Sequence, residues 1–351
     1  MERLQHHWYR LSPLHLLLYP VSLVFRLLVA LRRFLYRSGI LASIKLPVPV
    51  IIVGNISVGG TGKTPLTLWL AQQLIDNGWH PGIVSRGYTK QNKQRQTPHE
   101  VLIDDATDEV GDEPLLMAQR AVCPVWIGRD RPAAALALLQ RHPECDIILS
   151  DDGLQHYRLQ RDVEIVVVDG ARHFGNGLLL PAGPLREPVS RLQKVDAVVI
   201  NGGTNAMRPP LLNPLPQAGE ETTESLRDYP INEFAMRLEG TCFYNLINPQ
   251  LTVSAAEFAG QRLHALAGIG HPQRFFAHLE HLGLSIQPHP FPDHHCYVAA
   301  DLMFDDADAV LMTEKDAVKC ASLATEKCWV LRVDAQLSPT LTQLILKKVA
   351  Q

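Results

Sequence analysis

The segment from Ser57 to Thr64, SVGGTGKT, has the residue types and spacing of a phosphate-binding loop. A β-branched run at Val48–Val53 precedes it and a helical pattern at Pro65–Asn77 follows, which is the strand–loop–helix order that such a loop requires. Glycines let backbone N–H groups turn toward phosphate oxygens, and the helix N-terminus favours the same anion. We predict that the loop binds a nucleotide, by default ATP, through Ser57, Val58, Gly59, Gly60, Thr61, Gly62, Lys63 and Thr64.

Two side chains of this loop carry most of its expected chemistry. Lys63 would neutralise charge on the β- and γ-phosphates, and Thr64 would bind Mg²⁺ through its hydroxyl. The usual pattern begins with glycine, whereas this loop begins with Ser57, so that Gly59 and Gly60 must supply the flexibility. The alternative is a glycine-rich turn with an unrelated lysine.

Carboxylates that could complete a magnesium site follow two of the predicted strands. Asp151 and Asp152 come directly after the strand-like run Asp146–Ser150, and Asp169 follows the run Val163–Val168. Two adjacent carboxylates repel each other unless a cation or hydrogen-bond donors compensate them, which favours the pair over Asp169. The alternative for each is a turn or helix-cap aspartate.

Two further polar residues have no assignment from their own surroundings. Asp112, in EVGDEP, is typical of an acid at a helix N-terminus, where the dipole stabilises it. His294, in FPDHH, could belong to a metal site, a pH-sensitive patch or a solvated loop.

The first 45 residues differ from the rest of the chain. They hold seven basic residues and one acid, a net charge of +6, whereas the whole chain of 351 residues carries −3. The run Leu14–Leu35 is strongly apolar, but Arg26 interrupts it and Pro20 would kink a helix there. We predict a membrane-associated helix, interfacial or shallowly anchored, with the body on the cytoplasmic side. The alternative is an ordinary buried helix.

The elements that must position these residues alternate between strand and helix. This pattern predicts an α/β fold: a P-loop NTPase-like, mostly parallel sheet covered by helices, with a second, smaller α/β domain. We expect an N-terminal helix at 1–45, a core at 46–204, a Pro- and Asn-rich linker at 205–230 and the smaller domain at 231–351.

The 33 basic and 36 acidic residues argue against a nucleic-acid-binding protein. Six cysteines without a C-x-x-C pair fit a reducing compartment.

Taken together, the motifs resemble the tetraacyldisaccharide 4′-kinase family, the lipid A 4′-kinases of Gram-negative bacteria. The stretches that carry the resemblance occur in one order along nearly the whole chain: GNISVGGTGKTP, SRGY, EVGDEP, IGRDR, DDGLQH, GNGLLLPAGPLRE, FPDHH and MTEKDAVK. A serine at the start of the loop is part of this family's pattern. The linker is the least family-like stretch.

The resemblance implies transfer of the ATP γ-phosphate to the 4′-hydroxyl of an acylated disaccharide lipid, tetraacyldisaccharide 1-phosphate, to form lipid IVA at the cytoplasmic face of the inner membrane. It implies that Asp112 is the catalytic aspartate, with His294 as its partner and Lys63 in the P-loop role; the choice between His294 and His295 stays open. The resemblance further implies that three acids lie around magnesium and the nucleotide: Asp151, Asp152 and Glu187. It implies contacts with the nucleotide or the substrate for His156, Arg186, Arg86 and Tyr88. Nothing in the sequence indicates a protein partner.

Two other classes of function share part of these features. A P-loop switch or metallochaperone-type NTPase would explain the loop, the acids and the histidines, but not the apolar arm. A membrane-tethered nucleotide-binding module without catalysis would leave the intact lysine, threonine and acids unexplained. Transfer of phosphate to an acceptor separates the kinase from both.

Overall fold

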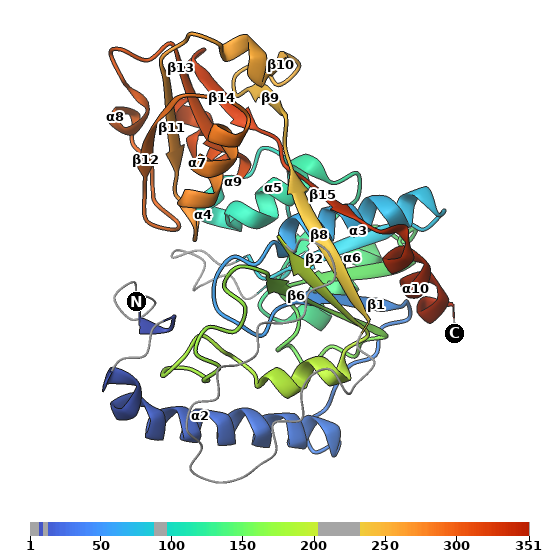
Figure 1. Ribbon diagram of the computed structural model, residues 1–351. Helices are drawn as coiled ribbons and strands as arrows, with labels where there is room; N and C mark the ends of the chain where they lie inside the picture. Colours follow the sequence, from blue (N-terminus) through green and yellow to red (C-terminus); the bar gives the residue numbers. More distant parts are fainter. Residues whose placement is uncertain (1–6, 10–12, 88–96, 203–231, 351) are drawn as a thin grey trace.

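The computed structural model describes residues 7–9, 13–87, 97–202 and 232–350. Tyr88 and the predicted linker at 205–230 therefore lie outside the described residues. Two sheets organise the rest, one of nine strands and one of six, and Figure 1 shows them as a larger body with a smaller unit packed beside it. The predicted α/β class is confirmed.

The larger sheet has the strand order β15-β8-β7-β6-β1-β5-β2-β4-β3, with β1 at its centre and parallel to both neighbours. Its strands are β1 (Val50–Gly54), β2 (Pro81–Ser85), β3 (His99–Glu100), β4 (Val125–Ile127), β5 (Ile147–Asp151), β6 (Val163–Asp169), β7 (Ala197–Asn201), β8 (Glu233–Glu239) and β15 (Asp334–Leu337). The predicted strands Val48–Val53, Asp146–Ser150 and Val163–Val168 are present as β1, β5 and β6, within two residues at each end.

Helices cover both faces of this sheet because successive side chains of a strand point to opposite sides. Ile51 and Val53 of β1 belong to a core with α3, α5 and α10, while Val50 and Ile52 face α6 and the 3₁₀ helix η1. The helices of this part are α2 (Pro13–Arg37), α3 (Lys63–Asp76), α4 (Thr107–Val110), α5 (Asp112–Arg120), α6 (Arg131–Arg141), η1 (Val189–Lys194) and α10 (Pro339–Val349).

The smaller sheet has the order β10-β9-β14-β13-β11-β12. Its strands are β9 (Cys242–Asn245), β10 (Thr252–Ser254), β11 (Leu263–Ala267), β12 (Ile286–Pro290), β13 (Ala309–Thr313) and β14 (Cys328–Leu331); its helices are α7 (Pro272–His281), α8 (Ala299–Leu302), α9 (Glu314–Cys320) and the 3₁₀ helices η3 (Ala255–Phe258) and η4 (Ala321–Leu323). The two prolines of β12 are tolerated because this strand is at an edge.

The predicted boundary of the smaller domain at residue 231 requires correction. Strand β8 pairs in parallel with β7, and β15 pairs with β8, so both strands belong to the larger sheet. Helix α10 packs there too, through Leu341 and Ile345. The chain thus leaves the larger sheet after β8, builds the smaller unit, and returns through β15. Such a return depends on pairing between distant strands, which local periodicity does not record.

The two units contact each other directly through α5 and α9. Arg120, at the end of α5, places one guanidinium nitrogen 2.8 Å from each carboxylate oxygen of Glu314, at the start of α9. The same guanidinium also pairs with Asp334, where the chain re-enters the larger sheet. One guanidinium group that contacts two carboxylates in this way restricts orientation as well as distance, so it helps to set how the smaller unit faces the larger one.

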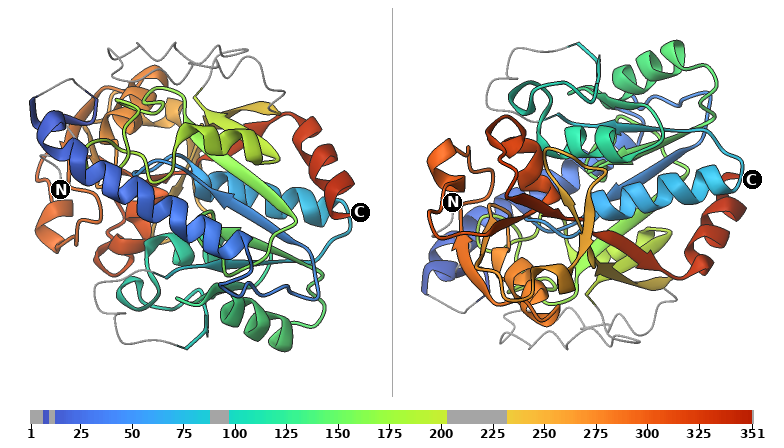
Figure 2. Two further views of the ribbon diagram at one scale, coloured as in Figure 1. Left: turned by 90° about the horizontal axis from the view of Figure 1, so that it is seen from below. Right: turned by 90° about the horizontal axis from the view of Figure 1, so that it is seen from above.

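Helix α2 lies across the molecule as a separate layer, which is clearest from below in Figure 2. Its Ser22 hydroxyl donates to the Leu179 carbonyl at 2.7 Å, and Phe25 packs against the core. Much of its apolar surface is exposed, including Leu17, Leu27 and Phe34. Within the described residues, no helix has both the length and the apolar character needed to cross a bilayer.

Candidate active site

The phosphate loop joins the carboxyl end of β1 to the first turn of α3, as predicted. Gly59 and Gly62 have φ angles of 105° and 95°, which residues with a side chain rarely adopt. A Cβ on Gly62 would also lie 2.5 Å from the amide nitrogen of Asn201. That amide donates to the Thr61 carbonyl at 3.0 Å and so holds the loop against the end of β7. Asn201 was not among the predicted site residues.

Asp152 is the acid that faces the loop lysine. Its Oδ1 lies 3.4 Å from Lys63 Nζ and 3.6 Å from Arg186 Nη1. Burial by itself would raise the pKa of this carboxyl, but Lys63 and Arg186 outweigh it and hold the pKa at about 2. Asp152 Oδ1 is buried and has no hydrogen bond within the described part of the chain. An ionised, incompletely satisfied carboxylate beside the phosphate-binding loop fits the oxygen ligands that magnesium prefers.

Asp151 occupies a different environment from its neighbour. It is fully buried at the end of β5 and accepts hydrogen bonds of 3.3 Å from the hydroxyls of Thr67 and Ser85. Burial, reinforced by the charge of Glu113, raises its pKa to about 7. The pair therefore divides into an ionised acid toward the loop and a readily protonated acid behind it, a distinction that adjacent sequence positions could not reveal.

This buried acid predicts how stability depends on pH. Between about pH 4 and pH 7 the folded state holds the Asp151 proton more tightly than the unfolded state, because the pKa rises from 3.8 to about 7 on folding. The free energy of unfolding contributed by this group therefore falls as pH rises through that range. In melts without nucleotide, Asp151→Asn should show a smaller drop in Tm between pH 5 and pH 7 than the parent. Equal drops would contradict the assignment.

A buried arginine behind the two acids was missed as a site residue. Arg131 begins α6 and is 1% exposed, and its guanidinium donates to the carbonyls of Gly128 and Asp151, at 2.8 and 3.2 Å. Burial, together with the charges of Arg131 and Arg86, lowers the pKa of His156 to about 3, so this imidazole is neutral. Neutral His156 can donate or accept a hydrogen bond, as a substrate contact requires.

The structure brings Asp112 and His294 together although they are 182 positions apart. Asp112 begins α5, and His294 follows β12 of the smaller unit with a φ of 59°. His294 Nδ1 lies 3.1 Å from Asp112 Oδ2. Burial would raise the pKa of Asp112, but the His294 hydrogen bond and the charges of Lys319 and Lys315 outweigh it, so the pKa is below its usual value. An ionised aspartate at neutral pH can accept a proton.

Lys315 binds the acids on either side of this pair. Its Nζ lies 3.2 Å from Glu113, next to Asp112, and 3.5 Å from Asp293, next to His294. Burial would lower the pKa of Lys315, but Glu113 and Asp293 outweigh it and raise the pKa above its ordinary value. The ammonium group therefore links the larger unit to the smaller one where the aspartate and histidine meet.

We expect Lys315→Met to change the pH dependence of the phosphate transfer that the resemblance implies. Loss of the ammonium charge should raise the pKa of Asp112, so the acidic limb of the kcat/KM profile should move to higher pH. The rate below that limb should fall by up to about tenfold for each pKa unit. A pH–rate profile beside Lys347→Met, which alters a lysine of α10, measures the effect. An unshifted limb would contradict it.

Asp169, the alternative magnesium ligand, is engaged elsewhere. Its carboxylate accepts hydrogen bonds from Arg172, at 2.9 Å, and from Arg274 of α7 in the smaller unit. Arg172 in turn donates to the Gly60 carbonyl of the loop. Asp169 therefore links the phosphate loop to α7 through two arginines, neither of which was predicted.

The other predicted residues occupy two places. Arg186 joins the site through Asp152 and by its backbone N–H, which donates to Ile56 beside the loop. Glu187, the next residue, turns away: its buried carboxylate accepts hydrogen bonds from Gln155 at 2.9 Å and Tyr157 at 2.7 Å and lies 3.4 Å from Arg191. These contacts give Glu187 a structural role, because its carboxylate holds Gln155, Tyr157 and Arg191 together. Its role as a magnesium ligand stays a prediction.

The smaller unit approaches the loop closely. A Cβ on Gly270 would lie 3.6 Å from the backbone nitrogen of Gly60 and equally far from Asp293. A phosphate loop at the central strand of a parallel sheet, with an ionised acid at the neighbouring strand end and a second unit packed against it, defines a P-loop nucleotide-using enzyme.

Comparison with known proteins identifies the family. A family model described as tetraacyldisaccharide-1-P 4′-kinase matches residues 14–350. Tetraacyldisaccharide 4′-kinases from Methylobacillus flagellatus and Azoarcus sp. strain BH72 are each 50% identical to the chain, covering 99% and 98% of it and 96% and 94% of their own lengths. A crystal structure described as the "apo" form of LpxK from Aquifex aeolicus in complex with ATP has a TM-score of 0.75 at 29% identity, covering 96% of this chain and 99% of that one. The chain belongs to the tetraacyldisaccharide 4′-kinase family.

Proposed function

We propose that this protein transfers the γ-phosphate of ATP to the 4′-hydroxyl of tetraacyldisaccharide 1-phosphate, in lipid A biosynthesis. The observation that carries the proposal is the contact between Asp112 and His294 beside the phosphate loop, at 3.1 Å. A nucleotide hydrolase needs a water-positioning group, whereas a half-buried aspartate aligned by a histidine suits removal of a proton from a sugar hydroxyl. Membership of the family and the ATP named for the Aquifex structure support the same reaction.

Each residue has a distinct role in this mechanism. The loop from Ser57 to Thr64 binds the phosphates, and Lys63 compensates the charge that develops on them. Asp112 accepts the proton of the attacking hydroxyl, and His294 orients its carboxylate. Magnesium, when bound, would be held by Thr64 and Asp152 with Asp151 behind, and would lower the negative charge on the phosphates. Arg86, Tyr88, His156 and Arg186 would contact nucleotide or sugar.

The proposal also places the protein at the cytoplasmic face of the inner membrane. The exposed leucines of α2 support this location, since an apolar helix face with basic residues beside it is typical of helices that lie in a bilayer interface. A substrate with four acyl chains would then reach the site without leaving the membrane.

The direct test is transfer of label. The purified protein is incubated with γ-labelled ATP, magnesium and detergent-dispersed tetraacyldisaccharide 1-phosphate, and the products are separated by thin-layer chromatography. Label should move to the lipid, and α-labelled ATP under the same conditions should leave the lipid unlabelled. ATP consumption that is independent of the lipid, with no labelled lipid, would contradict the kinase.

A further inference from the structure

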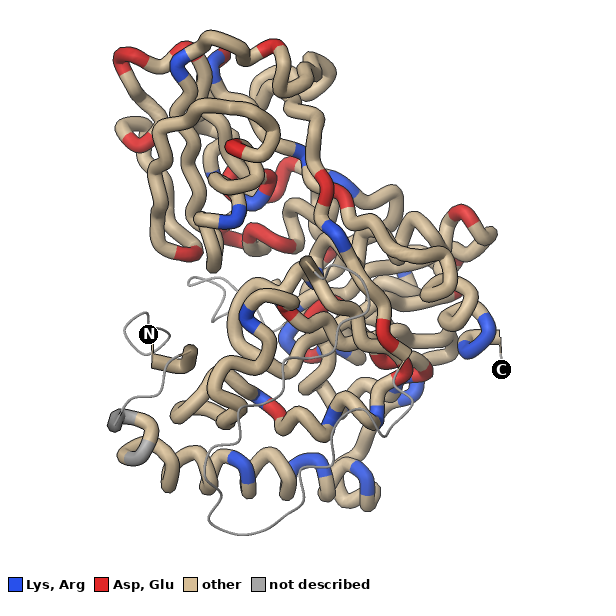
Figure 3. Tube along the Cα trace, viewed as in Figure 1, with Lys and Arg blue, Asp and Glu red and all other residues tan. Residues whose placement is uncertain are grey.

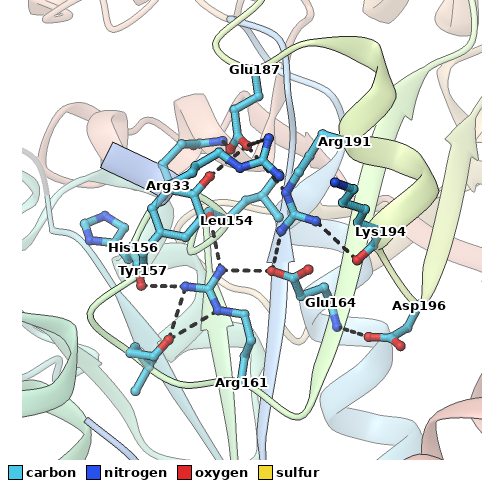
Figure 4. Close-up of polar contacts among 12 residues, drawn as sticks. Arg33, Leu154, His156, Tyr157, Arg161, Glu164, Glu187, Arg191, Lys194 and Asp196 are labelled. Atoms are coloured by element: carbon cyan, nitrogen blue, oxygen red, sulfur yellow. Dashed lines mark hydrogen bonds and ion pairs between the residues drawn. The ribbon is translucent and has the colours of Figure 1, made fainter. Parts of the chain in front are cut away.

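A cavity of about 420 Å³ lies between the C-terminal end of α2 and the body of the protein. Five cationic side chains and one acidic side chain line it, and Figure 4 shows most of them converging on one space. They are Arg33, Arg37, Arg161, Arg191, Lys194 and the single acid Glu164. No residue of the phosphate loop takes part in this lining.

Part of this positive charge is held rigidly in place. Arg161 donates to the carbonyls of Leu154 and His156, at 2.9 and 2.6 Å, and contacts Glu164 at 3.0 Å. Arg191, 5% exposed, pairs with Glu164 as well. Arg191 also lies 3.4 Å from Glu187, so Glu164 and Glu187 balance this guanidinium pair, and the surplus positive charge of the cavity is on its other cations. A preorganised guanidinium pair is a preferred geometry for binding phosphate.

The remaining cations are less fully neutralised inside the protein. Arg33 lies 3.9 Å from Glu187, a long ion pair. Arg37 and Lys194 are exposed, and across the described ranges neither has an acidic partner. Exposed cations beside a rigid cationic cluster favour an anionic ligand that enters from solvent or from a surface outside the protein.

The helix that contributes Arg33 and Arg37 to the cavity also carries an exposed apolar surface. Leu27, Leu31 and Phe34 share one face of α2 and are 68%, 49% and 61% exposed. Ile40 and Leu41, just beyond the helix, extend this surface. All four arginines of α2 follow Phe25, so charge is concentrated in the half of the helix that borders the cavity, as Figure 3 shows. A ligand with an anionic group and apolar chains would satisfy both features.

We propose that this cavity binds the phosphate of an anionic phospholipid headgroup while the acyl chains of that lipid lie against the exposed face of α2. The charge of the cavity and the apolar face of the same helix together favour a lipid over a soluble phosphate, which would use only the charge. Bound lipid would fix how deeply and at what angle α2 lies in the membrane. The site is separate from the nucleotide site, so its test does not depend on kinase activity.

Flotation with lipid vesicles tests the site. Binding of the full-length protein to phosphatidylcholine vesicles is compared with binding to vesicles that contain 30 mol% phosphatidylglycerol, on the order of a cytoplasmic leaflet's anionic content. Ser43 lines the cavity, and its hydroxyl accepts a hydrogen bond from the Gln160 side chain. Because of this position, Ser43→Trp would fill the space without changing the charge. It should abolish the preference for anionic vesicles and leave binding to phosphatidylcholine within about twofold, because the apolar face of α2 is intact.

Matched variants distinguish lipid binding in the cavity from diffuse electrostatic attraction between the protein and the vesicle surface. Ser38→Trp adds the same bulk outside the lining and should keep the preference. Lys194→Gln should lower the preference about fivefold, whereas Lys45→Gln, an exposed lysine outside the lining, should change it much less. Equal losses for the two lysines, or an unchanged preference in Ser43→Trp with parent-like Tm, would overturn the proposal. The proposal would also be overturned if the parent protein showed no preference for anionic vesicles but bound inorganic phosphate in calorimetry, and if Lys194→Gln abolished that phosphate binding.

Discussion

Replacing Lys63 with alanine is expected to lower kcat for phosphate transfer by about 10²–10³-fold, the effect of removing one preorganised charge from a transition state. Lys63 begins α3, is the loop's only cation and pairs with Asp152 at 3.4 Å. The ion pair thus positions the ammonium group at the phosphate-binding loop. Single-turnover transfer of label to the lipid measures the chemical step.

A second variant identifies the reason for that loss. Lys63→Ala removes the cation that contributes most to the low pKa of Asp152, so an unbalanced carboxylate could by itself repel ATP. Lys63→Ala combined with Asp152→Asn removes both charges. We expect no recovery in the double variant, because the lysine acts on the transferred phosphate. Recovery to within about threefold of Asp152→Asn alone would instead assign Lys63 to neutralising that aspartate.

Asp112→Asn is expected to reduce kcat by about 10²–10⁴-fold, the usual contribution of a general base, while the Kd for ATP changes little. The amide keeps the shape and the contact with His294 but cannot accept the proton. Asp108→Asn, an exposed acid of α4, provides the matched control. Full activity in Asp112→Asn, or a loss of ATP affinity that accounts for the lower rate, would contradict the assignment.

The histidine partner gives this prediction a second readout. His294 contacts Asp112 at 3.1 Å and contributes to its lowered pKa, so His294→Ala should raise that pKa and move the acidic limb of the pH–kcat profile upward. Because His294 acts through the Asp112 carboxylate, adding His294→Ala to Asp112→Asn should cost little more than Asp112→Asn alone. Additive losses would show that the two residues act independently.

Local patterns in the sequence were sufficient for the parts of the site built within one element. The phosphate loop, the strand before it and the helix after it were predicted because glycine φ requirements and hydrophobic periodicity are properties of neighbouring residues. The acids at the end of β5 were predicted for the same reason. The resemblance supplied Asp112 and His294, which their own surroundings could not assign.

What the sequence determined by itself was therefore the fold class, the nucleotide loop and the apolar, basic first helix. Tertiary structure alone decided which unit β8 and β15 join, that Asp152 rather than Asp151 faces Lys63, and that Lys315 links the acids around Asp112 and His294. It also decided that arginines from α2, β5–β6 and η1 meet in one cavity. The physical reason is that burial and pairing across more than a hundred residues set these pKa values and contacts, and neither is recorded in the spacing of neighbouring residues.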